Sequence, residues 1–240
     1  MANPTAAMLV IGDEILSGRT RDANMHHLAG ELTQVGIDLK EVRIVSDDRA
    51  AIIGAVKALS AGYDTVITSG GIGPTHDDIT ADCIAAAFDA HIDVRDDARA
   101  LLQAHYDRQG VEFNTARQRM ARIPDGAKLI ENPVSIAPGF TIGNVHVMAG
   151  VPSVFQAMVA SVLPTLTGGQ PLLSQTLRID RGEGEIAGPL SELAADFPDL
   201  SIGSYPFQRN GSYGANIVIR GSDGARVDAA MTRLSALFAQ

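Results

Sequence analysis

Apolar runs of strand length alternate with amphipathic segments of helix length through the first two thirds of this chain. Ala6–Ile11 and the shorter run Thr65–Thr68 are continuous apolar stretches, as expected for strands buried on both faces. Between them, Met25, Leu28, Leu32 and Val35 recur at the three- and four-residue spacing of one helix face. This order predicts an α/β fold, with a mainly parallel sheet between two layers of helices.

The order becomes less regular after residue 95. A helix is expected over residues 96–108, and a short helix over 116–122 carries a cluster of three arginines, Arg117, Arg119 and Arg122. Gly143-Asn144 lies between two apolar runs and is typical of a two-residue hairpin turn. Pro152 is well placed in the first turn of a further helix that runs to about residue 166.

A linker is predicted at Thr167-Gly168-Gly169-Gln170-Pro171 because glycine and proline cluster there. The expected domains are therefore residues 1–167 and residues 171–240. The second domain follows the order strand, helix, strand, strand, helix, over residues 174–179, 185–195, 201–204, 215–220 and 226–239. That order suits a small α+β domain with an antiparallel sheet.

Composition excludes several classes of partner. The chain has 240 residues, 45% of them hydrophobic, and a net charge of −9, which disfavours nucleic acids and anionic membranes. Cys83 is the only cysteine, so an intrachain disulfide and a cysteine zinc site are excluded. No apolar run approaches the ~18 residues of a membrane span, and the first residues lack a signal-peptide pattern. We therefore expect a cytoplasmic protein.

A glycine-rich segment follows the apolar run 65–68, and it reads Ser69-Gly70-Gly71-Ile72-Gly73-Pro74-Thr75-His76-Asp77-Asp78. Backbone N–H groups in such a turn, beside the start of a helix, favour phosphate, so Ser69, Gly70, Gly71, Gly73 and Thr75 are candidate phosphate ligands. No P-loop motif is present. Asp77 and Asp78 would repel a phosphate unless a divalent cation bridged them. The alternative is a tight turn in which the carboxylates only favour the helix start, with Thr75 to Asp78 as a loose capping box.

Two further loops follow predicted strands and are expected at the same edge of the sheet, because ligands of open parallel sheets bind at the carboxyl ends of the strands. The first, Gly12 to Gly18, offers Asp13 and Glu14 as metal ligands and Ser17 as a phosphate donor. The second, with Gly150, Pro152 and Ser153, would form another wall. The alternative for the first loop is a polar turn with a helix cap.

These segments, together with Asn132-Pro133 and Ala137-Pro138-Gly139-Phe140, resemble the molybdopterin-binding domain superfamily (MogA/MoaB-like), closest to the amino-terminal domain of the competence/damage-inducible CinA proteins. The resemblance implies a three-layer α/β/α domain whose glycine loop binds the phosphate of a pterin or nucleotide. Residues 171–240 resemble the small α+β domain that follows in this branch. A similar domain accompanies eukaryotic FAD synthase.

The resemblance also implies two functions. In the CinA branch the domain is associated with metal-dependent hydrolysis of ADP-ribose-like pyrophosphates, for which Asp77 and Asp78 would be catalytic and Asp13, Glu14, Asp77 and Asp78 would hold Mg²⁺, Mn²⁺ or Co²⁺. The alternative is a binding protein for molybdopterin without hydrolysis. Two departures bear on the choice: Ser135 stands at a family glycine, and Val154-Phe155 stands where the family has Glu-Met. Related domains form dimers or trimers, so a homo-oligomer is expected.

Overall fold

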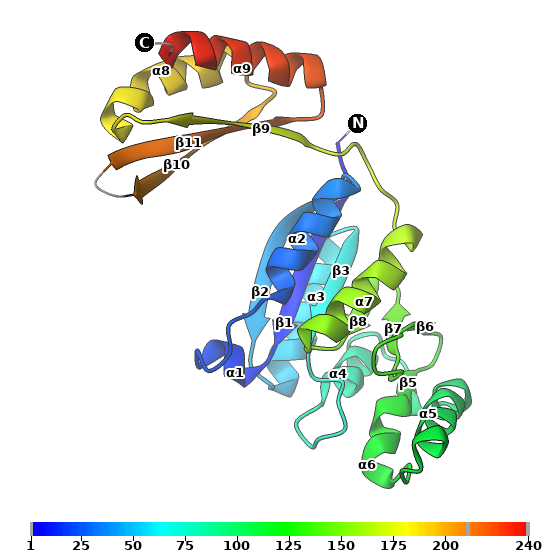
Figure 1. The fold of residues 1–240 in the computed structure, drawn as a ribbon. Coiled ribbons are helices and arrows are strands. Elements are labelled where there is room, and N and C mark those ends of the chain that lie inside the picture. Colours follow the sequence, from blue (N-terminus) through cyan, green and yellow to red (C-terminus); the bar gives the residue numbers. More distant parts are fainter. Residues whose placement is uncertain (1, 210–211, 239–240) are drawn as a thin grey trace. The chain divides into compact units, whose positions relative to one another are not determined.

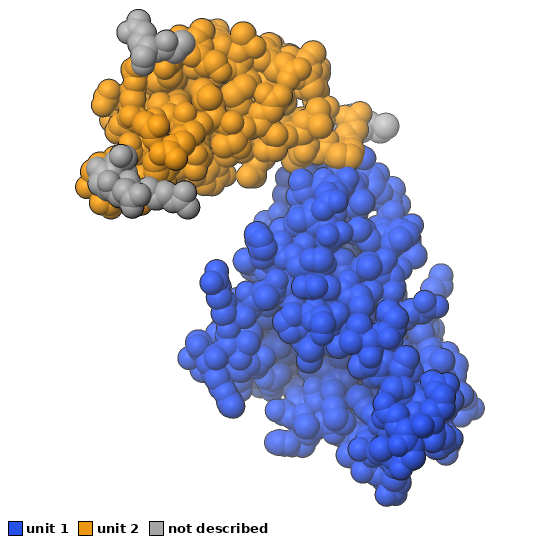
Figure 2. Space-filling model, viewed as in Figure 1, with its two compact units in different colours: residues 1–169 blue, residues 170–240 orange. Residues whose placement is uncertain are grey.

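The computed structural model describes residues 2–209 and 212–238 of the chain. Two compact units divide it, Met1–Gly169 and Gln170–Gln240 (Figure 2). The ends of the predicted domains at Met1 and Gln240, and the last residue of the predicted final helix, Ala239, lie outside the described residues. None of the helices in the described ranges combines the length and hydropathy that crossing a bilayer requires.

A six-stranded sheet in the order β2-β1-β3-β8-β7-β6 forms the centre of the first unit. The first four strands in this order pair parallel, whereas β7 pairs antiparallel with β8 and with β6. The mainly parallel sheet predicted from the sequence is thus confirmed. Its strands are β1 (Thr5–Ile11), β2 (Asp38–Val45), β3 (Thr65–Ser69), β6 (Lys128–Ile130), β7 (Gly139–Ile142) and β8 (Val145–Met148).

Helices cover both faces of this sheet, which gives three layers (Figure 1). Alternate residues of β1 serve the two cores, so Leu9 packs towards α3, α4 and α5, and Met8 packs towards α2 and α7. This explains why β1 is apolar from Ala6 to Ile11. The helices and 3₁₀ turns of the unit are α1 (Asp13–Leu16), α2 (Asn24–Gln34), α3 (Arg49–Gly62), α4 (Thr80–Ala87), α5 (Asp96–Gln109), α6 (Thr115–Gln118), η1 (Arg119–Ala121), α7 (Pro152–Val162) and η2 (Leu163–Thr165).

The predicted hairpin joins β7 to β8, with Gly143 at a φ of 56° in the turn. Asn144 fixes this turn to the end of α3, because its side-chain amide donates to the carbonyls of Ser60 and Tyr63 at 3.0 and 2.8 Å. The turn residues therefore serve both the local hairpin and a distant contact.

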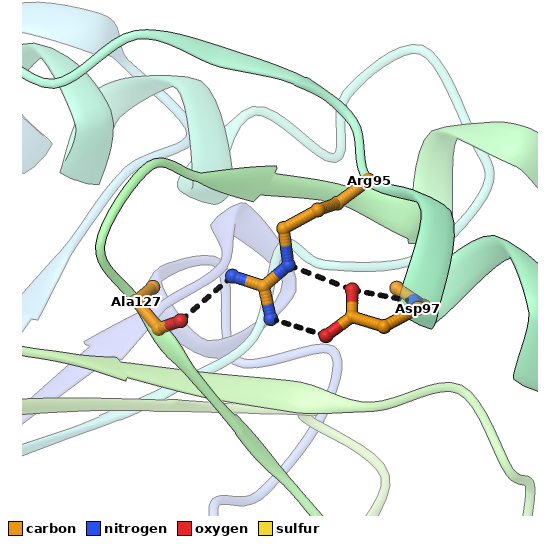
Figure 3. Close-up of polar contacts among 4 residues, drawn as sticks. Arg95, Asp97 and Ala127 are labelled. Carbon is orange, nitrogen blue, oxygen red and sulfur yellow. Dashed lines mark hydrogen bonds and ion pairs between the residues drawn. The ribbon is translucent and has the colours of Figure 1, made fainter.

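The segment between β3 and β6 carries a second, two-stranded sheet of β4 (Ile92–Val94) and β5 (Arg122–Pro124). Arg95 connects this segment to the start of α5, as Figure 3 shows. Its guanidinium forms a fork with both carboxylate oxygens of Asp97, at 2.7 and 2.9 Å, and donates to the carbonyl of Ala127 at 2.7 Å. Asp97 in turn accepts from the N–H of Ala98 in the first turn of the helix.

The second unit follows the predicted order of strand, helix, strand, strand, helix. A three-stranded antiparallel sheet, β10-β11-β9, packs against two helices through a core of its own that includes Ile217 and Leu234. The observed β10 and β11 run longer than predicted. The elements are β9 (Leu173–Ile179), α8 (Glu183–Asp196), β10 (Ser201–Arg209), β11 (Ser212–Gly221) and α9 (Gly224–Phe238).

Candidate functional site

A cavity of about 750 Å³ lies at the carboxyl ends of four neighbouring parallel strands. Gly12 follows β1, Asp47 follows β2, Gly70 follows β3 and Gly150 follows β8, and all four residues line it. The sheet topology therefore gathers loops that are far apart in the sequence at the edge where open α/β sheets bind their ligands.

The glycine segment after β3 forms the floor of this cavity. Gly70 and Gly71 have φ values of 111° and 70°, which side-chain-bearing residues rarely adopt. A Cβ atom on Gly70 would lie 2.2 Å from the carbonyl oxygen of Ile11, and one on Gly71 would lie 2.1 Å from Thr80 Oγ1. Space and conformation both require glycine here.

Thr80, the first residue of α4, fastens the glycine segment to that helix. Its N–H donates to the carbonyl of Gly71 and its hydroxyl donates to the carbonyl of Gly70, both at 3.0 Å. The segment therefore folds back on the helix start despite the eight residues in between. Both hydrogen bonds from Thr80 go to carbonyl groups of the segment, so neither involves its N–H groups.

Three consecutive N–H groups of the segment are unused. Within the described part of the chain, the N–H groups of Gly71, Ile72 and Gly73 donate to no backbone or side-chain acceptor, whereas that of Gly70 donates to Met148 at 3.1 Å. All three residues line the cavity. Successive free amides in a glycine turn form a concave anion-binding site.

The two carboxylates that follow also line the cavity. Asp78 Oδ2 accepts from the N–H and the hydroxyl of Thr75, at 2.8 and 2.5 Å. These bonds close a local turn over residues 75–78, but not the helix cap weighed as an alternative, because α4 begins at Thr80 and its N-cap residue Ile79 has no side-chain cap hydrogen bond. A Cβ atom on Gly73 would lie 2.6 Å from Asp78 Oδ2, so the glycine leaves room for the carboxylate.

The loop after β1 brings Glu14 to the cavity, with its carboxylate folded over Gly12. Asp47 joins it from the loop after β2 and accepts the N–H of Asp13 at 3.0 Å. Partial burial raises the pKa of Asp47; the hydrogen bond from Asp13 opposes this rise, and the negative charges of Asp13, Glu14 and Asp77 add to it. Negative charge is therefore concentrated on this side of the cavity.

Asn24 is a buried polar residue that supports the glycine segment, and only 3% of its surface is exposed. Its amide nitrogen donates to Ser69 Oγ and to the carbonyl of Gly150, both at 2.8 Å, so it joins the ends of β3 and β8. Ser69 is buried in this contact.

The other residues that line the cavity carry no charge. Asn132 is one of them, with its amide donating to Ser135 Oγ at 2.6 Å and to the carbonyl of Ala137 at 2.8 Å. Val154, at the position where the resemblance implies an acidic residue, contributes an apolar surface to the same cavity.

The predicted site residues fall into two groups. Around the cavity lie Glu14, Gly70, Gly71, Gly73, Asp77, Asp78, Gly150 and Pro152. Outside its lining lie Asp13, Ser17, Ser69, Thr75 and Ser153. Burial under Asn24 explains the position of Ser69, and bonding to Asp78 explains that of Thr75. Ser17, which is exposed, turns its hydroxyl towards the carbonyl of Glu14 at 3.4 Å.

Sequence reasoning missed the part played by Asp47 and Asn24. Asp47 had a usable signal, because the sequence also predicts a strand over residues 39–45, and Asp47 follows it as Asp13 follows residues 6–11. By residue type, either Asp47 or Asp48 could cap the next helix. The structure assigns that cap to Asp48, which accepts from Ala51 N–H at 2.8 Å. Asn24 gave no local signal, since its partners lie 45 and 126 residues away.

The carboxylates of the cavity are better suited to a cation that also binds the ligand than to a cation held by protein side chains alone. Four carboxylates line the cavity, those of Glu14, Asp47, Asp77 and Asp78. Yet no group of three or more His, Cys, Asp or Glu side chains within residues 2–209 and 212–238 converges closely enough to hold an ion. Mg²⁺ commonly needs only one or two carboxylates when substrate phosphates complete its shell.

Two parts of the chain match two different protein families. Residues 7–168 match the family described as probable molybdopterin binding domain, and residues 171–240 match the FAD synthase middle domain. The crystal structure of the protein CinA from Thermoplasma acidophilum, whose function is described as unknown, superposes with a TM-score of 0.63 at 30% identity. That match covers 69% of this chain and 99% of the other.

Curated relatives carry two kinds of name. A probable FAD synthase of Caenorhabditis elegans is 34% identical over 98% of this chain and 50% of its own length. A CinA-like protein of Citrifermentans bemidjiense is 39% identical over 68% of this chain and 40% of its own length. The chain thus spans about half the length, or less, of these relatives.

Proposed function

The chain belongs to the molybdopterin-binding domain family as a CinA-like member, and from that premise we propose that its cavity binds a phosphate-bearing nucleotide or pterin and hydrolyses the pyrophosphate of ADP-ribose or a related dinucleotide. The observation that carries this proposal is the row of three N–H groups at Gly71, Ile72 and Gly73, which have no acceptor in the described part of the chain and belong to residues that line the cavity together with four carboxylates. The free amides suit phosphate oxygens, and the carboxylates suit a cation.

Each part of the cavity has a distinct task in this reaction. The free amides hold one phosphate group, and the glycines let it approach the backbone closely. Asp77, Asp78, Glu14 and Asp47, which all line the cavity, are the residues that would hold a divalent cation against the phosphates. Such a cation neutralises phosphate charge and activates water.

Hydrolysis adds one water across the phosphorus–oxygen–phosphorus bridge. The water oxygen bonds to one phosphorus atom, the bridging bond breaks, and two phosphate monoesters leave. ADP-ribose would give AMP and ribose 5-phosphate, and FAD would give AMP and FMN. A carboxylate of the cavity would accept the proton that the water loses, which is a role for Asp78.

The test is AMP release from ADP-ribose, FAD and NAD, with Mg²⁺, Mn²⁺ or Co²⁺ and with EDTA. We expect cation-dependent cleavage of at least one dinucleotide, and a loss of roughly 100-fold or more in kcat for Asp78→Asn. Thr75→Val is the matched control, because it removes a hydrogen bond to Asp78 but keeps the carboxylate. Unchanged turnover in Asp78→Asn would rule out the catalytic role.

Binding without hydrolysis is the second candidate. The apolar Val154 in the wall and the lack of a convergent ligand group in the described ranges favour it. In that case no dinucleotide is cleaved in the panel, while molybdopterin or a nucleotide still binds, and Gly71→Ala abolishes that binding.

A further inference from the structure

Arg119 lies beside the glycine segment and next to Asp78, one of the carboxylate residues of the large cavity. It belongs to η1, 41 residues from Asp78, and its Nη2 donates to the carbonyl of Asp78 at 3.1 Å. It lines a second hollow of about 10 Å³, which shares Gly71, Gly73 and Asp78 with the large cavity. That volume holds about one water molecule, so a phosphate does not fit there.

The two neighbouring arginines have partners that account for them. Arg122 forms an ion pair with Asp82, at 2.5 Å between Nη2 and Oδ1. Arg117 donates to the carbonyl of Glu112, and its guanidinium lies 4.8 Å from the centre of the Tyr106 ring. Each therefore has a structural role within its own surroundings.

Arg119 is different. Across the described ranges it makes no ion pair with any carboxylate, and its Nε is buried without an acceptor. A buried charged donor without a partner destabilises the fold. The structure suggests a role for this residue, because Arg119 lines the small hollow together with Gly71 and Gly73, whose N–H groups have no acceptor among the described residues.

We propose that Arg119 is a positioning residue of the phosphate site, which holds the Asp78 turn by its backbone carbonyl and places a positive charge beside the glycine segment. The inference rests on the proposed function. The charge acts through the loop, since the hollow admits no ligand, and it offsets the repulsion between a bound phosphate and the carboxylates around it. This charge would add to the compensation that a divalent cation at the carboxylates provides.

The experiment is calorimetric titration of inorganic pyrophosphate with Mg²⁺ into the wild type and three variants, Arg119→Met, Arg119→Lys and Arg117→Met. We expect a roughly tenfold or larger rise in Kd for Arg119→Met, a smaller rise for Arg119→Lys because the charge remains, and little change for Arg117→Met. Arg117 lies in the same segment but lines neither cavity, so it controls for net charge.

The melting temperature of each variant separates positioning from stability. Equal Kd values for Arg119→Met and Arg117→Met would overturn the inference while leaving the proposed function intact. An equal loss of affinity in both Arg119 variants, matched by an equal fall in melting temperature, would also overturn it. If the wild type binds neither pyrophosphate nor any dinucleotide, the proposed function fails and the inference fails with it.

Discussion

His146 on β8 is a base that the fold keeps neutral. It is 8% exposed, and its Nδ1 lies 2.9 Å from Thr141 Oγ1 on the neighbouring strand β7. Burial lowers its pKa from 6.5 to about 4. The unfolded chain therefore binds a proton at a pH where the folded chain does not.

This difference makes stability depend on pH between about 6.5 and 4. The contribution of His146 is complete above its unfolded pKa of 6.5 and is lost as the pH falls towards 4. We expect the free energy of unfolding to fall by about 2 kcal/mol between pH 7 and pH 5 through this residue. Urea denaturation at both pH values measures it. His146→Gln should flatten the dependence, whereas His91→Gln, at an exposed position, should not; an equally steep dependence in His146→Gln would refute the assignment.

Some features of single residues in this site can be predicted from the local sequence, and others depend on distant parts of the chain. The positive φ values of Gly70 and Gly71 are a local requirement of the turn between β3 and α4, whereas the closeness of Gly70 to the Ile11 carbonyl depends on the pairing of β3 with β1. The choice between Asp47 and Asp48 is not local. It depends on the N–H of Asp13, 34 residues away, which becomes a neighbour only when β1 and β2 pair.

Elements with a strong hydrophobic periodicity could be predicted from the sequence. Strands formed by the pairing of segments far apart in the sequence could not. Helix α5 was predicted to within one residue at its end. Strands β4 and β5 escaped because each has three residues, β5 contains Pro124, and their pairing spans the whole of α5. Nothing within a three-residue segment distinguishes such a strand from a loop.

Arg95 links the start of α5 to Ala127, just before β6, so its replacement tests how much these hydrogen bonds stabilise the segment between β3 and β6. Arg95→Met would break the fork with Asp97 and leave the carbonyl of Ala127, an 8% exposed residue, without this donor. We expect the free energy of unfolding to fall by about 1–2 kcal/mol, more than for an exposed ion pair alone. Urea denaturation provides the measurement, with Arg108→Met on the exposed side of the same helix as control. Similar losses in the two variants would show that the Ala127 contact adds nothing.

For the chain as a whole, the decisive fact is that each unit has its own apolar core. The first unit holds two clusters, one on each face of its sheet, and the second holds a third cluster around β9, β11 and the two helices. Every residue that lines the large cavity belongs to the first unit.

Residues 1–169 should therefore fold and bind alone. We expect this fragment to keep a cooperative thermal transition by circular dichroism, and to bind pyrophosphate with Mg²⁺ within about threefold of the full chain, a difference of under 1 kcal/mol. The full chain is the control. A fragment that folds but has lost its affinity would show that residues 170–240, directly or through assembly of several chains, complete the site.

Gly150 approaches Gly70 so closely that a Cβ atom on it would lie 3.3 Å from the Gly70 Cα. Two loops from different strands thus touch backbone to backbone, with no side chain between them. Substitution of side chains can change little at this contact, whereas Met120 and Val151, which also line the cavity, carry side chains that can be exchanged. During evolution such a protein would keep the backbone contacts that bind the anionic group of the ligand. Substitutions of the lining side chains would change which molecule carrying that group is bound.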